Sequence, residues 1–255
     1  MTKPSENDTD TLPFLTILPN LVTMIGLCTG LTAIRFAMSE QYQFAVALII
    51  FSTLIDGLDG LLARRLNATS EIGAQLDSLS DFLNFGVAPG LIVYQFSLTD
   101  AEDTGGWIFV LVYVSCCCLR LARFNVGNSP TAAETAKNPR HFVGVPAPAG
   151  AMLALLPMFL SFEHGLDATS LPFLVGPYLA FVGLLMASRL PTFSPKSIRV
   201  PKSGLVWVLI ASALIVGALL TRFWLSMILI AVIYDISLVF SLVSWLRQRR
   251  SRRKM

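Results

Sequence analysis

The amino-acid sequence predicts an all-α, polytopic integral membrane protein, and two observations lead to this fold class. First, the 255 residues are 54% hydrophobic and only 14% charged, whereas soluble domains are about 45–50% apolar and about 25% charged. Second, apolar stretches close to the roughly 20 residues that a helix needs to cross a bilayer recur along the whole chain. We expect about eight transmembrane helices, at residues 16–38, 44–62, 76–96, 107–121, 146–162, 171–186, 205–220 and 224–246.

Polar segments flank this predicted helical bundle. Residues 1–11 lack the basic start, apolar run and cleavage site of a signal peptide, and we expect a disordered cytoplasmic tail there. Residues 12–246 are expected to form a single transmembrane catalytic domain. Residues 247–255 are rich in Arg, which predicts a basic cytoplasmic tail that favours anionic membrane lipids. No basic and aromatic module accompanies this tail, so nucleic acid is not an expected partner.

Lys and Arg are distributed unevenly between the two sides of the predicted bundle. Eight spans place both termini on one side with most of these residues, while the other side carries only Arg35 and Arg222. Positive charge marks the cytoplasmic side. We therefore expect a protein of the inner (plasma) membrane whose termini and active site face the cytoplasm. Cys28 and the run at 116–118 lie in apolar stretches without metal-ligand spacing, which is typical of packing residues.

Four carboxylates lie where charge is unfavourable. Asp56 and Asp59 are near the end of the second predicted span, and Asp77 and Asp81 are at the start of the third. Spacings of three and four residues place each pair on one helix face, and a short turn makes the two helices antiparallel neighbours. A charged side chain at membrane depth costs about 2.5–3.5 kcal/mol, so cations are expected between the acids. All-oxygen ligands suit Mg²⁺, Mn²⁺ or Ca²⁺, as one ion or a pair.

Residues near the acids suggest that a phosphate group binds with the metal. Gly57, Gly60 and Gly73 let a partner helix or a ligand approach the backbone. Arg64 offers a planar fork for phosphate oxygens. Two alternatives remain, a buried acid–arginine cluster that joins two helices and a divalent cation transporter. A transporter leaves Arg64 unexplained, since a cation path gains nothing from a fixed positive charge.

From Asp56 to Asp81 the residues follow the pattern D-x-x-D-G-x-x-A-R-x8-G-x3-D-x3-D. With all eight identities present, the sequence resembles the CDP-alcohol phosphatidyltransferase family. The resemblance implies that family's helical fold, the donor CDP-diacylglycerol, an alcohol that attacks with loss of CMP, and two divalent cations, Mg²⁺ or Mn²⁺. It also implies a homodimer. The implied roles are metal ligation by Asp56, Asp59, Asp77 and Asp81, general-base catalysis by Asp81, and CDP-lipid contacts by Gly60, Ala63, Arg64 and Gly73.

Further stretches resemble the phosphatidylserine synthase branch of this family and favour L-serine as the acceptor. They cover residues 18–23, 76–89, 119–125 and 142–150. Serine is a zwitterion whose carboxylate suits an arginine fork. The expected serine-binding residues are Arg120, Arg123, Asn125 and Arg140. Arg120 and Arg123 are also interpretable as cationic anchors at the membrane surface.

Other assignments stay open at the level of sequence. Asn20 and Thr23 share a face of the first predicted helix and are expected to contact the CDP-lipid, although Asn20 also suits a helix cap. Glycerol phosphate, inositol phosphate and choline are alternative acceptors within the family. Asp235 is an acid inside the last predicted span, and we interpret it as a helix-packing hydrogen-bond partner.

Overall fold

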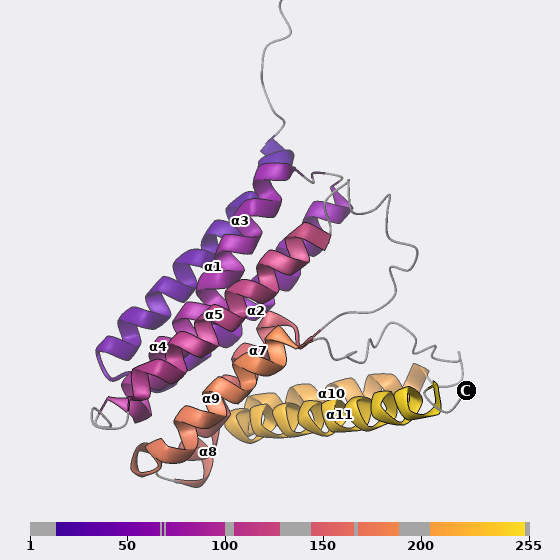
Figure 1. The fold of residues 1–255 in the computed structure, drawn as a ribbon. Helices are drawn as coiled ribbons and strands as arrows, with labels where there is room; N and C mark the ends of the chain where they lie inside the picture. Colours follow the sequence, from indigo (N-terminus) through magenta and orange to yellow (C-terminus); the bar gives the residue numbers. More distant parts are fainter. Residues whose placement is uncertain are drawn as a thin grey trace, which may run out of the picture.

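A computed structural model describes residues 14–66, 68, 70–99, 105–127, 144–165, 168–188 and 205–252, and every regular element among them is helical. The predicted all-α class is therefore confirmed for this part of the chain (Figure 1). The predicted tail at residues 1–11 lies outside the described residues. The α-helices are α1 Phe14–Met38, α2 Tyr42–Arg65, α3 Glu71–Asp81, α4 Ala88–Val93, α5 Gly106–Gly127, α7 Ala147–Ala154, α8 Leu156–His164, α9 Pro172–Ala187, α10 Leu205–Thr221 and α11 Phe223–Arg252.

Each of the eight predicted spans coincides with a helical segment. Four helical stretches are both long and apolar enough to cross a membrane, namely Ile17–Met38, Tyr42–Arg65, Gly106–Gly127 and Phe223–Ser241. The segments Pro172–Ala187 and Ile210–Thr221 are apolar but shorter. Helix α11 continues through the predicted basic tail as far as Arg252.

Two predicted spans are more irregular than expected. The third is a continuous helical path in which α3 and α4 alternate with two π-helical turns, η1 Phe82–Val87 and η2 Tyr94–Leu98. A π-helical turn inserts an extra residue and redirects the side chains that follow. The fifth is divided at Leu155 into α7 and α8, because Pro157 supplies no backbone N–H and restricts the residue before it.

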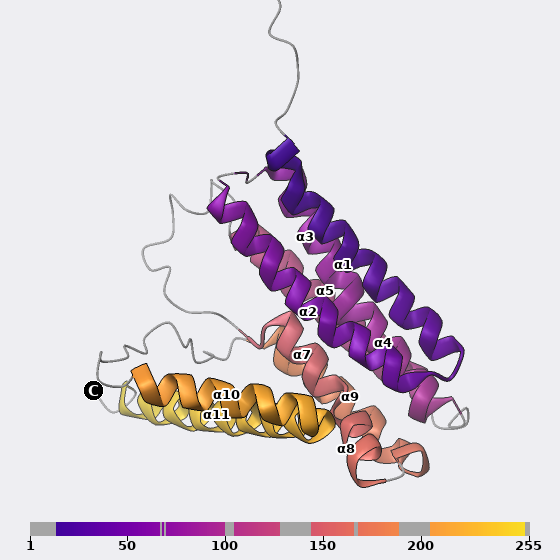
Figure 2. The same ribbon diagram turned by 180° about the vertical axis from the view of Figure 1, so that it is seen from behind.

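Helices α1 to α5 form one elongated bundle (Figures 1 and 2). Helix α1 packs against both α2 and α3, and α5 packs against α9. At Gly183 of α9, an added Cβ would lie 2.8 Å from the Tyr113 Cα, so glycine permits this close approach of α9 to α5. The Tyr113 hydroxyl donates to the Phe85 carbonyl at 2.7 Å and ties α5 to η1.

Helices α10 and α11 form a hairpin in which only Arg222 separates them. Both views show this hairpin lying at a wide angle to the α1–α5 bundle, with one end beside α8 (Figures 1 and 2). An ion pair between Arg222 and Glu163 at 3.5 Å and contacts of Trp224 with Phe159 and Phe162 hold that end in place. The hairpin is thus attached through α8.

Candidate functional site

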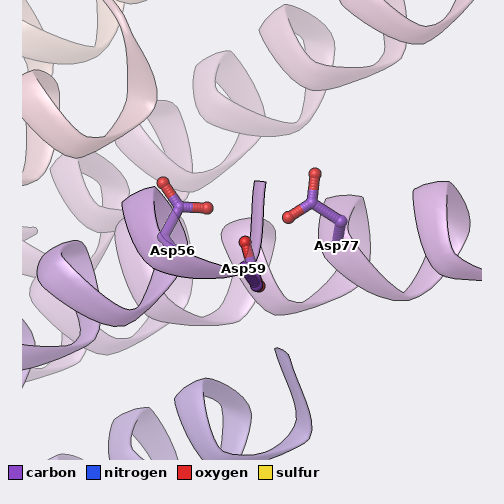
Figure 3. Close-up of side chains that lie close together, drawn as sticks. All are labelled: Asp56, Asp59 and Asp77. Atoms are coloured by element: carbon purple, nitrogen blue, oxygen red, sulfur yellow. The ribbon is translucent and has the colours of Figure 1, made fainter. Parts of the chain in front are cut away.

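Three carboxylates from two helices converge on one point of the bundle. Asp56 and Asp59 project from α2 and Asp77 from α3, and one oxygen from each lies within 4.8 Å of the others. Figure 3 shows Asp59 between Asp56 and Asp77. Asp59 is only 5% exposed. The prediction that two successive helices pool their acidic side chains is therefore confirmed for these three residues.

Asp81, the fourth predicted acid, ends α3 where the π-helical turn η1 begins. Its carboxyl group is at hydrogen-bonding contact with Asp56 and within electrostatic range of Asp59 and Asp77. Carboxyl groups this close repel one another unless a cation lies between them. The oxygen-only donor set of Asp56, Asp59 and Asp77 fits a hard divalent cation such as Mg²⁺ or Mn²⁺.

Thr23 of α1 fixes one of these carboxylates. Its hydroxyl lies 2.6 Å from Asp59 Oδ2 and 3.1 Å from the Pro19 carbonyl, and the residue is buried. The shorter distance is typical of an O–H donor to a charged oxygen. Sequence reasoning missed this bond, because nothing in the sequence shows that α1 crosses α2 at that height. Nucleotide contact by Thr23 stays a prediction.

A buried polar chain continues from Thr23 into the bundle. The Ser80 hydroxyl donates to the Thr23 carbonyl at 3.4 Å, and Asn84 Nδ2 donates to Ser80 Oγ at 3.2 Å. An added Cβ at Gly30 would overlap Asn84 Oδ1, so glycine leaves room for this amide. The chain links α1 to α3 and η1.

The predicted CDP-lipid contacts divide into an open group and a packed group. At Gly60 an added Cβ would meet, among the described residues, only Arg64 Nη2, at 4.0 Å, so none of them fills the space beside it. At Gly73 it would lie 2.7 Å from Asn20 Oδ1 and 3.0 Å from Ser70 Oγ, the N-cap of α3. Gly73 and Asn20 thus pack α1 against α3.

Two further details concern the same group. Helix α1 begins at Phe14, so the alternative that Asn20 caps it is wrong. Ala63 is partly buried on α2, one residue before the exposed Arg64. CDP-lipid contact by all these residues stays a prediction.

The arginines predicted to bind serine hold helix ends together. Arg120 Nε donates to the Val145 carbonyl just before α7, and Arg123 Nη2 donates to the Ala187 carbonyl at the end of α9 at 2.7 Å. Asn125 Oδ1 accepts from the Ser78 hydroxyl at 3.0 Å. These bonds give both arginines a role in packing, and both serine contact and anchoring at the membrane surface stay predictions.

The positions of two other predicted residues are as follows. Arg140 lies outside the described residues. Asp235 of α11 forms no hydrogen bond within the described ranges, so the packing hydrogen bond expected for it is not found there. It is within electrostatic range of Tyr178 and Tyr234.

Comparison with known proteins agrees with this site. The family model described as CDP-alcohol phosphatidyltransferase matches residues 16–191, which contain all four acids. A Mycobacterium bovis protein named CDP-diacylglycerol–serine O-phosphatidyltransferase is 38% identical over 242 residues, covering 92% of this chain and 82% of its own. A Helicobacter pylori protein with the same name is 31% identical, and the match covers 91% of this chain and 92% of that protein. A Bacillus subtilis protein with the same name is also 31% identical, and the match covers 73% of this chain and 97% of that protein. The chain is therefore an integral membrane protein that belongs to the CDP-alcohol phosphatidyltransferase family.

Proposed function

We propose that the chain transfers the phosphatidyl group of CDP-diacylglycerol to L-serine and yields phosphatidylserine and CMP. The observation that carries this proposal is the convergence of Asp56, Asp59 and Asp77 within 4.8 Å, inside the complete eight-residue motif. The names of the relatives support the choice of serine, since the similarity extends over most of the chain.

The acids of α2 and α3 hold two divalent cations in this proposal. Asp56, Asp59, Asp77 and Asp81 supply the ligand oxygens, and Thr23 keeps Asp59 in its ligating orientation through the 2.6 Å hydrogen bond. When bound, such cations stabilise the negative charge that develops on the diphosphate as CMP leaves.

The donor lies along the open side of α2. Gly60 and Ala63 border the CDP group, because none of the described residues fills the space beside Gly60. The guanidinium of Arg64, whose Nη2 reaches over Gly60, binds phosphate oxygens. Asn20 and Gly73 shape the wall between α1 and α3.

Asp81 acts as the general base. A serine hydroxyl is a weak nucleophile at neutral pH, and a positioned carboxylate assists by removing its proton. The serine oxygen forms a bond to the lipid-linked phosphorus, the bond from that phosphorus to the bridging oxygen breaks, and CMP departs with the electron pair. The proton passes to Asp81, which lies beside the other acids and at the start of η1.

The acceptor enters from the end of α5. Arg120 Nε donates a hydrogen bond to the Val145 carbonyl, and the terminal nitrogens of Arg120 make no hydrogen bond within the described part of the chain. In this proposal they bind the serine carboxylate. The guanidinium is within electrostatic range of Asp81, the base that takes the proton of the serine hydroxyl. Arg123, Asn125 and Arg140 complete this acceptor region in the proposal.

The membrane arrangement is part of the same proposal. All eight helical segments span or enter the bilayer as one transmembrane domain of the inner membrane. The end of the bundle that carries the acids faces the cytoplasm, where serine and the nucleotide are dissolved. The basic residues after position 246 bind anionic lipid head groups, and the protein works as a homodimer.

A panel of alcohols tests the function. Purified full-length protein receives CDP-diacylglycerol with Mn²⁺ or Mg²⁺ and, separately, L-serine, glycerol phosphate, inositol phosphate or choline, and CMP release is measured. Of these alcohols, we expect only L-serine to give CMP release above the buffer control. The serine assignment is wrong if serine releases no more CMP than buffer, and release with another alcohol identifies that alcohol as the acceptor.

A further inference from the structure

Tyr234 of α11 has a hydroxyl group whose environment no structural role explains. The side chain packs against the buried core, yet its hydroxyl is inaccessible to solvent and has no hydrogen-bond partner within the described ranges. Burying an unpaired hydroxyl is unfavourable, because its bonds to water are lost without replacement. Phenylalanine would fill the same space without that penalty.

Arg120 of α5 is a positively charged group that interacts electrostatically with this hydroxyl. The two side chains are within electrostatic range of each other, and Arg120 is also within range of Asp81. The Tyr234 hydroxyl is buried without an acceptor in the described part of the chain. Arg120 is only partly buried, and its Nε donates to the Val145 carbonyl while its terminal N–H groups make no hydrogen bond within the described ranges. An O–H donor and a charged N–H donor within electrostatic range of each other suit an anionic oxygen ligand.

We propose that Tyr234 donates a hydrogen bond to the carboxylate of the acceptor serine beside Arg120 and thereby favours serine over acceptors without an anionic group. This inference rests on the proposed function and adds to it a residue that neither the motif nor the acceptor stretches include. A hydroxyl that must pair with the substrate disfavours an acceptor such as choline, because it then stays buried and unpaired.

A phosphate of the donor is the other anion that fits these two groups. The residue range of the family match favours serine instead. The match covers residues 16–191, and every donor contact of the proposed function lies within this region. Tyr234 lies on α11, beyond that region, and α11 reaches the bundle through α8 (Figures 1 and 2). A group supplied from outside the shared region suits the acceptor, which differs between members.

The test compares two Tyr→Phe substitutions in the full-length protein. Tyr178 of α9 is the matched control, since its hydroxyl donates to the Leu153 carbonyl at 2.9 Å and is therefore satisfied. CMP release is measured against the concentrations of L-serine and of CDP-diacylglycerol separately, and the thermal midpoint of each variant is measured in the same detergent. Wild-type protein must first show serine-dependent release. Its absence would refute the proposed function and the inference with it, whereas serine-dependent release in wild type combined with an unchanged KM for serine in Tyr234→Phe would refute the inference alone.

For Tyr234→Phe we expect the KM for serine to rise about tenfold, which corresponds to about 1.4 kcal/mol. The KM for CDP-diacylglycerol and the thermal midpoint should stay at or above their wild-type values. Tyr178→Phe should show the reverse, a lower midpoint with an unchanged KM for serine. An unchanged KM for serine in Tyr234→Phe overturns the proposal, a rise in the donor KM alone assigns the hydroxyl to a donor phosphate, and a midpoint lowered as in Tyr178→Phe makes its role structural.

Discussion

Replacing Thr23 with Val removes the hydroxyl that orients Asp59 and leaves a side chain of nearly the same shape. The bond is 2.6 Å long and buried, and its acceptor is a carboxylate. Hydrogen bonds to charged groups contribute about 1.5–3 kcal/mol. If that free energy serves to hold Asp59 in a ligating position, kcat/KM falls by about 10- to 150-fold.

The assay measures CMP release from CDP-diacylglycerol and serine over a range of Mn²⁺ concentrations. We expect Thr23→Val to need more Mn²⁺ for half-maximal rate, because Asp59 is then free to rotate away from the other acids. Thr23→Ser keeps the hydroxyl and should stay close to wild type. Thr29→Val is the matched control on the same helix, since the Thr29 hydroxyl bonds only to the Ile25 carbonyl, at 2.8 Å.

Three results would refute this reasoning. A Thr23→Val protein with the Mn²⁺ requirement and rate of wild type would show that the hydroxyl does not orient Asp59. A Thr23→Ser protein as defective as Thr23→Val would show that the methyl group matters, through packing, and the hydroxyl does not. A loss in Thr29→Val of the same size would indicate a general effect on α1.

Three further substitutions test other parts of the site. Asp81→Asn should retain binding of CDP-diacylglycerol and lose CMP release, because the amide cannot accept the serine proton, and comparable turnover would exclude the base role. Gly60→Ala should fold normally, since the nearest protein atom is 4.0 Å from the new Cβ, and raise the KM for the donor. Gly57→Ala, where no atom lies within 4 Å, is its control, and an equal effect on both would place the donor elsewhere. Gly30→Ala should lower stability by about 1–3 kcal/mol in thermal unfolding, because the methyl group overlaps Asn84, whereas an unchanged midpoint would mean that the amide moves freely.

The helices and the acid cluster were accessible from the sequence because both follow from local rules. Apolar length identifies a helix in a bilayer, and spacings of three and four residues place Asp56 with Asp59 and Asp77 with Asp81 on one face each. A short connection between α2 and α3 then brings the two faces together. The chemistry of the site thus depends on contacts within about thirty residues, the range that sequence periodicity describes.

Features that depend on long-range packing were not predictable in the same way. The bond from Thr23 to Asp59 joins two different helices, and the crossing point of α1 on α2 is set by all their packed side chains. The π-helical turns after Asp81 and the electrostatic proximity of Tyr234 to Arg120 likewise arise from packing. A tyrosine inside an apolar helix has the same sequence pattern whether its hydroxyl is paired or not.

The depth of the site explains why selectivity should come from a different helix than catalysis. Asp56 lies nine residues before the end of α2 (65 − 56), and Arg120 lies seven before the end of α5 (127 − 120). At 1.5 Å per residue these offsets are about 14 and 10 Å, so both lie about two to three turns below the helix ends. The acids face one another there, since charge exposed to hydrocarbon is costly, and their proposed roles as metal ligands and general base apply to any alcohol. In our proposal the acceptor is therefore selected by the groups around Arg120, and a hydroxyl on α11 can change without disturbing the cluster of acids.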